Sequence, residues 1–172
     1  MKTFEKLFIE LNKWALILLL SAMSVIVFTN VSLRYLTSYS ITWAEEVARY
    51  MMIWMTFLGA GLTLRYGGHV AIGNLMEMLP PGGQRVLRAV IAAVLVVFFA
   101  TMVWIGYAYA ARMQFQMTPA TRIPFFYVYA AIPAGFLLLA VHLLLIVRGY
   151  VADNRFEEAA GVPGDLSSSL GG

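Results

Sequence analysis

The sequence contains no cysteine and only two histidines, His69 and His142. The lack of cysteine excludes disulfide bonds, iron-sulfur clusters, zinc sites with thiolate ligands and covalently attached haem. Two histidines give little support to a metal site built from a histidine cluster, and the chain has neither a Walker-type nor a dinucleotide-type glycine loop. We therefore expect no catalytic residues, no metal and no cofactor, and we predict that the chain is not an enzyme.

Charged residues are also scarce. They make up 12% of the 172 residues, against about 25% in ordinary soluble domains. They leave uncharged windows at residues 14–33, 50–64, 89–111 and 123–147. A hydrocarbon core about 30 Å thick needs about 20 apolar residues in a helix, so three windows are long enough and the second is short. The pattern predicts an all-α integral membrane protein with four transmembrane helices.

Local signals divide the chain into a membrane domain at residues 1–152 and a tail at 153–172. Residues 2–13 carry apolar side chains at helical spacing against charged ones, which predicts an amphipathic N-terminal helix at the membrane surface. A short surface helix is expected between spans two and three, around His69 and Glu77. The polar, glycine-rich tail is expected to be disordered. The four spans are predicted at about residues 14–34, 42–65, 84–111 and 124–148.

The second span has the clearest start signal. Thr42, followed three residues later by Glu45, fits a capping box, in which the threonine hydroxyl caps the helix. The uncharged stretch after Arg49 rises only about 22 Å at 1.5 Å per residue, so Arg49 and Glu46 are expected near or inside the apolar boundary. Charges at that depth are costly against lipid.

Proline and small residues bear on how the helices pack. Pro133, inside the fourth span, removes one backbone hydrogen bond and is expected to bend that helix. Small residues at four-residue spacing would let helices approach closely. Such pairs include Gly59 with Thr63, Gly106 with Ala110 and Ala131 with Gly135.

Lysine and arginine are distributed unequally between the two ends of the predicted spans. The positive-inside rule then places both termini in the cytoplasm. The basic residues are spread along loop ends and form no single patch, so we do not expect nucleic acid to be a partner. Eight lie on one side (Lys2, Lys6, Lys13, Arg65, Arg85, Arg88, Arg148 and Arg155) and four on the other (Arg34, Arg49, Arg112 and Arg122).

Glu45, Glu46 and Arg49 form one polar stripe at the outer end of the second span, and three interpretations are open. The stripe can be a capped helix end with snorkelling side chains. It can face a second membrane subunit, because a charged stripe at that depth is best tolerated against protein. Proton-coupled transport through one of the acids has the least support, since no other acid lies within a span. Asn30 and Arg34 can bond to a neighbouring helix, although Arg34 as a boundary marker is preferred.

His142 and the outer loop each have two interpretations. His142 can ligate haem, but a membrane haem needs an axial partner on a facing helix, and His69 lies in a surface segment. A lone hydrogen-bonded histidine is the preferred interpretation. The loop with Gln114, Gln116 and Arg122 is either a connector or a surface on which a soluble partner docks.

Three segments resemble one known family. Residues 42–72, TWAEEVARYMMIWMTFLGAGLTLRYGGHVAI, closely resemble the signature of the small membrane subunit of tripartite ATP-independent periplasmic (TRAP) transporters, the DctQ-like family. Residues 118–135, TPATRIPFFYVYAAIPAG, resemble the segment before its last helix, and residues 30–35, NVSLRY, are similar to the end of its first. The resemblance covers roughly residues 5–150.

The resemblance implies a division of labour in the bacterial inner membrane. A DctP-like periplasmic binding protein captures an organic acid, a large DctM-like subunit carries it with the sodium gradient, and the small subunit braces the fixed scaffold of the large one. Under this hypothesis the chain contacts lipid and both partners but handles no cargo. The predicted subunit interface is Trp43, Glu45, Glu46, Arg49 and Gly59, and the predicted docking surface is Arg34, Arg112, Gln114, Gln116 and Arg122.

Two other function classes stay open at this point. One is a membrane anchor subunit of a redox complex that holds haem b through His69 and His142, which predicts a coloured protein. The other is a stand-alone small exporter that dimerises around Glu45 or Glu46, which predicts transport by the chain alone.

Overall fold

The computed structural model describes residues 2–65 and 80–153. Within these ranges four segments are long and apolar enough to cross a membrane, namely Glu5–Thr37, Ala44–Arg65, Gly82–Phe115 and Phe125–Val147. The prediction of an all-α protein with four candidate spans is confirmed. The elements are α1 (Lys2–Thr37), α2 (Ala44–Arg65), α4 (Pro81–Arg112), the 3-10 turn η1 (Met113–Phe115), α5 (Phe125–Tyr129) and α6 (Ala131–Asp153).

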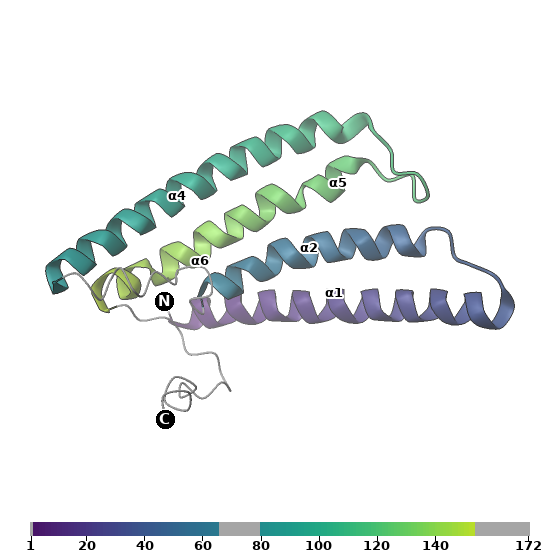
Figure 1. Cartoon of the computed structure of the whole chain (residues 1–172), viewed down its shortest axis with the longest axis horizontal. Helices are drawn as coiled ribbons and strands as arrows, with labels where there is room; N and C mark the ends of the chain where they lie inside the picture. Colours follow the sequence, from purple (N-terminus) through teal and green to yellow (C-terminus); the bar gives the residue numbers. More distant parts are fainter. Residues whose placement is uncertain (1, 66–79, 154–172) are drawn as a thin grey trace, which may run out of the picture.

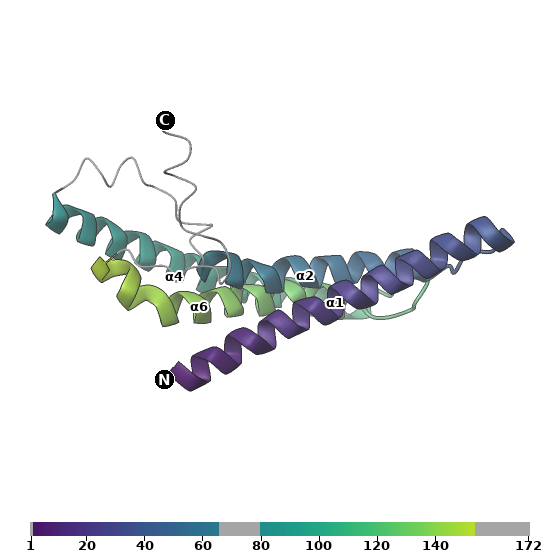
Figure 2. The same cartoon turned by 90° about the horizontal axis from the view of Figure 1, so that it is seen from below.

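The spans form an open row in the order α1, α2, α6, α4. Helix α2 packs against both α1 and α6, and α6 packs against α4 on its other side (Figure 1). Figure 2 shows the same row turned by 90°, as a thin layer that α1 crosses obliquely. The start of α1, the end of α2, the start of α4 and the end of α6 lie at one end, which we call the terminal end. The α1–α2 and α4–α5 connections lie at the opposite end, which we call the loop end (Figure 1).

The predicted N-terminal surface helix and the first span are one continuous helix. Helix α1 runs from Lys2 to Thr37 without a break, and the sequence has no glycine or proline in that stretch. Ile9 and Asn12 are buried in the row. One side of this segment, with Ile9 and Asn12, therefore packs on the neighbouring helices, whereas Leu7 and Leu11 of the amphipathic pattern stay exposed.

Helix α2 begins at Ala44, two residues later than predicted. The Ala44 N–H donates to the Ile41 carbonyl at 3.1 Å, and the Val47 N–H donates to the Trp43 carbonyl at 3.0 Å. Trp43 therefore occupies the cap position that the sequence pattern assigns to Thr42. The capping-box prediction is wrong by one residue, because a backbone turn closes the start of the helix.

The fourth span is interrupted at Ala130, between α5 and α6. Pro133 has no N–H to donate to the carbonyl of Tyr129, four residues earlier. Hydrogen bonds continue on both sides, from the Ala130 N–H to Phe126 at 2.8 Å and from the Ala134 N–H to Ala130 at 3.2 Å. The irregularity thus lies one turn before Pro133, where the proline ring acts on the helix.

Two predicted features lie outside the described residues. The surface helix around His69 and Glu77 falls in residues 66–79, and the tail predicted to be disordered falls almost entirely in residues 154–172. Both stay predictions, as does the domain boundary at residue 152.

Two glycines lie at close contacts between neighbouring helices of the row. A Cβ added to Gly135 of α6 would lie 2.6 Å from the Cβ and 3.0 Å from the carbonyl oxygen of Phe57 in α2. One added to Gly106 of α4 would lie 2.8 Å from Ile132 Cγ2 in α6. Gly59 has more room, since an added Cβ would lie 3.8 Å from Leu16. Small residues therefore permit close packing at Gly106 and Gly135, which belong to two of the predicted pairs.

Gly135→Ala is expected to destabilise the α2–α6 contact by about 1–3 kcal/mol, because the backbone of Phe57 blocks the added methyl group. Gly59→Ala is the matched control and is expected to leave stability unchanged or to raise it by up to about 1 kcal/mol, because alanine has the higher helix propensity. The free energy of unfolding of both variants can be measured by detergent titration of the purified chain. Equal stability of the two variants would contradict the assigned helix contact.

Candidate interaction site at the loop end

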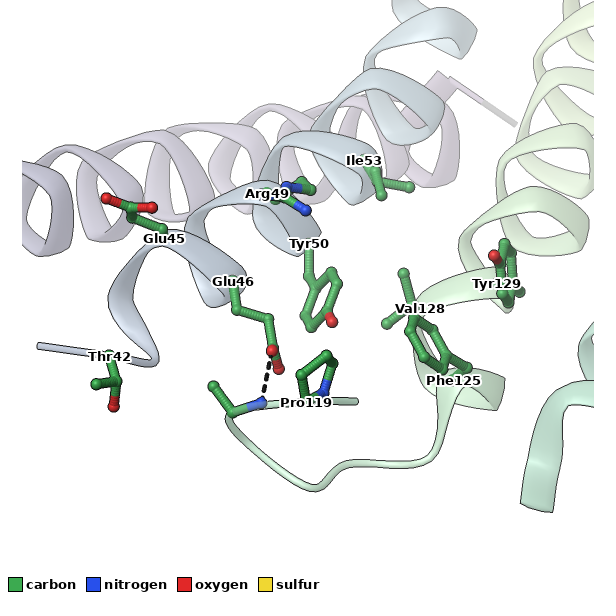
Figure 3. A pocket seen from close by; sticks show the side chains of 11 residues that line it. Thr42, Glu45, Glu46, Arg49, Tyr50, Ile53, Pro119, Phe125, Val128 and Tyr129 are labelled. Atoms are coloured by element: carbon green, nitrogen blue, oxygen red, sulfur yellow. Dashed lines mark hydrogen bonds between the residues drawn. The ribbon is translucent and has the colours of Figure 1, made fainter. Parts of the chain in front are cut away.

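A cavity of about 480 Å³ lies at the loop end between α2 and α5 (Figure 3). Its charged and hydroxyl groups come mainly from the first two turns of α2, whereas the α5 wall is apolar and aromatic. The lining residues are Thr42, Glu45, Glu46, Arg49, Tyr50 and Ile53 of α2 and the turn before it, Pro119 and Ala120 of the α4–α5 connection, and Phe125, Val128 and Tyr129 of α5.

The cavity exists because α5 packs mainly on α4, while α6 packs closely on α2. Two contacts bridge α2 and α5. The rings of Tyr50 and Phe125 meet edge to face with their centroids 6.5 Å apart. The Trp54 Nε1–H donates to the carbonyl of Tyr127 at 3.1 Å. These contacts hold the two helices together but leave the space beside them unfilled.

Glu46 fastens the α4–α5 connection onto α2. Its carboxylate accepts hydrogen bonds from the Ala120 N–H at 2.8 Å, the Thr121 N–H at 3.1 Å and the Thr121 hydroxyl. Figure 3 shows the bond to Ala120. Hydrogen bonds to a charged group are shorter and stronger than those between neutral groups. The partners are more than 70 residues apart in the chain, so this contact depends on the tertiary fold.

The connection itself is a compact turn. The Thr118 N–H donates to the Ile123 carbonyl at 2.9 Å, and the Ile123 N–H donates back to Thr118 Oγ1 at 3.0 Å. The Phe125 N–H donates to the Gln116 carbonyl at 2.9 Å and closes the turn. Arg122 has a φ of 56°, in the left-handed region that residues other than glycine rarely adopt. The turn therefore presents its exposed side chains from a fixed backbone.

A second set of contacts joins the end of α1 to the start of α2. Arg34 Nη1 lies 3.7 Å from Glu45 Oε1, with both side chains more than half exposed. An exposed pair of this kind contributes less than about 1 kcal/mol. Asn30 is buried, and its Oδ1 accepts a hydrogen bond from the Ile41 N–H at 2.7 Å. Asn30 therefore shapes the α1–α2 connection. Arg34 lies near the end of α1 and also contacts Glu45 of α2.

The predicted site residues have separate places in the structure. Glu45, Glu46 and Arg49 line one cavity, and Gly59 lies farther along α2 beside α1. Within the described ranges the ion pair of Glu45 is with Arg34, although Arg49 has the favourable four-residue spacing. The role of these residues in subunit contact stays a prediction. The exposed side chains near the loop end include Trp43, Arg34, Arg112, Gln114, Gln116 and Arg122.

The sequence patterns did not reveal Ala120 and Thr121 as the partners of Glu46. The segment around Pro119 has turn-forming residues, which is the only local signal available. The bonds to Glu46 come largely from backbone N–H groups, and every residue except proline carries one. The residue types at positions 120 and 121 were therefore a weak signal, since only the Thr121 hydroxyl adds a side-chain donor.

His142 has a packing role near the terminal end. Its side chain is fully buried, its Nε2 lies 3.4 Å from Asn12 Nδ2, and its ring centroid lies 4.9 Å from that of Phe8. Gly61 leaves room for the ring, since a Cβ there would lie 2.6 Å from His142 Cδ2. The prediction of a hydrogen-bonded histidine is confirmed. His69, the other residue of the haem hypothesis, lies outside the described residues.

Comparison with known proteins matches most of the chain to one family. Residues 23–151 match the family described as tripartite ATP-independent periplasmic transporters, DctQ component. The chain is 44% identical over 70 residues to the putative TRAP transporter small permease protein of Haemophilus influenzae, and the matched segment covers 41% of this chain and 44% of that protein. It is 32% identical over 117 residues to the ectoine TRAP transporter small permease protein TeaB of Halomonas elongata, and this match covers 67% of this chain and 61% of that protein.

A third relative is much longer than this chain. The match to the isethionate TRAP transporter permease protein DctMQ of Oleidesulfovibrio alaskensis is 25% identical over 151 residues and covers 86% of this chain but 24% of that protein. The matched segments therefore span about half the length of the first two relatives and about a quarter of the third.

Glu46→Ala is expected to release the α4–α5 connection from α2, because three hydrogen bonds lose their acceptor. Hydrogen exchange at the amides of Ala120 and Thr121 should become roughly tenfold to a hundredfold faster, the equivalent of one charge-assisted hydrogen bond. Glu45→Ala, one residue away, should leave these two amides unchanged. Unchanged exchange in the Glu46 variant would show that other contacts hold the connection.

Proposed function

Because the chain belongs to the DctQ component family of the tripartite ATP-independent periplasmic transporters, we propose that it is the small membrane subunit of such a transporter. It pairs with a larger, DctM-like permease subunit in the bacterial inner membrane, and it neither catalyses a reaction nor carries cargo itself. The observation that carries the proposal is the open row of helices, which leaves broad faces of its inner helices available to another membrane protein.

A bracing role agrees with the distribution of polar groups. A transport pathway needs polar groups from several helices that converge within the bilayer. In residues 2–65 and 80–153 the clusters of ionisable residues lie toward the loop end and the terminal end of the helices. Glu45, Glu46 and Arg49 lie at the loop end, and Arg65 makes a buried ion pair with Glu5 near the terminal end. Such clusters fix helices to one another, which suits a scaffold.

We propose that the sodium and substrate sites belong to the larger subunit. The long DctMQ relative supports this pairing, since this chain matches only a quarter of it. Relatives are named for ectoine, isethionate and C4-dicarboxylates, and we propose an organic acid as the substrate of the complex.

The loop end is proposed to face the periplasm, with both termini in the cytoplasm. The eight lysines and arginines predicted for one side of the membrane and the four predicted for the other support this orientation. Arg34, Arg112 and Arg122 are exposed near the loop end. The sequence has no acid between Glu77 and Asp153, so the α4–α5 connection presents cations without acids of its own. We propose that this surface, with Gln114 and Gln116, docks the DctP-like binding protein.

Uptake into proteoliposomes is expected to require this chain together with the larger subunit and the binding protein. Omission of this chain should reduce uptake to the level of empty vesicles, because the larger subunit loses its brace. Uptake of a radiolabelled organic acid under a sodium gradient measures this. Transport by this chain alone, or full transport without it, would contradict the proposal.

The double variant Arg112→Glu, Arg122→Glu is expected to raise the binding-protein concentration needed for half-maximal uptake by about tenfold, because charges at the rim of an interface control association. The rate at saturating binding protein should change little. Arg85→Glu, an exposed substitution near the terminal end, is the matched control. An identical concentration dependence in both variants would remove the docking role.

A further inference from the structure

The exposed side of α2 differs from the exposed sides of the outer helices of the row. Helices α1 and α4 expose many large apolar side chains, whereas Met52 is the one that α2 exposes in this way within the described ranges. The other exposed residues of α2 are spaced from Met52 and from one another by three, four or seven positions, and residues at these intervals lie along one side of a helix. The exposed residues of this side are Glu45, Arg49, Met52, Thr56 and Thr63, which we call the α2 face.

The lower part of the α2 face, at Thr56 and Thr63, has small side chains whose hydroxyl groups form hydrogen bonds within the helix. The Thr56 hydroxyl donates to the Met52 carbonyl at 2.8 Å, and the Thr63 hydroxyl donates to the Gly59 carbonyl at 3.2 Å. Neither hydroxyl needs a partner outside the helix. Small side chains such as threonine let another membrane helix approach closely and gain van der Waals contact. Flexible lipid chains gain less from such a surface than a fitted helix does.

The upper part of the α2 face carries two charged residues, Glu45 and Arg49, and Arg49 is the cation. Its side chain lines the cavity, where Figure 3 shows it beside Tyr50. Both neighbouring carboxylates are engaged, Glu46 by the α4–α5 connection and Glu45 by Arg34. Among residues 2–65 and 80–153 no carboxylate lies within ion-pair distance of Arg49. A cation in this part of a span is costly against lipid and is stabilised by an acid.

We propose that a helix of the larger subunit packs along the α2 face and that an acidic side chain of that helix enters the cavity to pair with Arg49. The proposal rests on the proposed function, because it takes the larger subunit as the partner. The charge of Arg49 selects an acid. Ile53, Phe125 and Val128 provide an apolar wall for the methylene groups of the acid, and the small lower part of the face accommodates the rest of the helix.

The contact can be mapped by site-specific cross-linking, since the chain has no cysteine of its own. The Thr56→Cys substitution provides a thiol on the α2 face, to which a thiol-reactive benzophenone probe is attached. Thr101→Cys is a matched control on α4, because Thr101 is also exposed and its hydroxyl donates to a carbonyl four residues earlier, at 2.8 Å. In membranes that contain the whole complex, the probe at position 56 is expected to cross-link to the larger subunit and the probe at 101 is not.

Charge variants test the role of Arg49. Arg49→Glu is expected to reduce co-purification of the larger subunit at least tenfold, Arg49→Gln to reduce it less, and Arg49→Lys to retain most of it. Arg85→Glu should leave co-purification unchanged. Circular dichroism and thermal unfolding of the isolated Arg49→Glu chain verify that it folds. A lysine substituted for one acid of the larger subunit should restore pairing with Arg49→Glu.

The possible outcomes separate this inference from the proposed function. Cross-linking from position 101 but not from position 56, in a complex that still co-purifies, would overturn the α2 face and leave the proposed function standing. Absence of any co-purification would overturn both. If Arg49→Glu leaves co-purification intact but removes a phospholipid that native mass spectrometry detects on the isolated chain, a lipid occupies the cavity and the inference is wrong.

Discussion

Helices α2 and α6 approach each other closely, and glycines make this approach possible. Gly135 lies against Phe57, and Gly61 leaves space for the ring of His142. In a membrane the hydrophobic effect does not drive helices together, so van der Waals contact between closely approaching helices has to hold them. This contact lies in the middle of the row. Helix α1 is added on the α2 side and α4 on the α6 side, so this contact joins the two halves of the row.

The same contact explains why the loop end needs its own fastening. Pro133 and the break at Ala130 separate α5 from α6, and α5 then follows α4 instead of α2. The space that opens is the cavity, and Glu46 spans its edge by binding the backbone of the α4–α5 connection. The carboxylate of Glu46 thus has a structural partner inside the chain. Arg49, one turn farther along α2, has its neighbouring acids already engaged.

Sequence patterns predicted the fold class well, because a bilayer allows few solutions. A span must be a run of apolar residues long enough to cross the hydrocarbon core, and its backbone groups must be satisfied within the helix. Uncharged windows therefore located all four spans. The ends were less predictable. Thr42 has the residue type of a helix cap, but a backbone turn moved the cap to Trp43. The pattern of residues 2–13 was amphipathic, but whether such a helix lies on lipid or on protein depends on its neighbours.

The candidate site shows the same division. The sequence placed Glu45, Glu46 and Arg49 in one stripe of one helix, since their spacing alone fixes that geometry. It did not assign their partners, and the three residues turned out to have different surroundings. Glu46 holds a turn more than 70 residues away, Glu45 pairs with Arg34, and Arg49 lines a cavity. Local composition and short motifs were enough to predict the number of spans, the grouping of the three charged residues and the family. The order of helices in the row, the position of the cavity and the partner of each charge could not be predicted in this way, because they depend on which distant surfaces approach most closely in the folded chain.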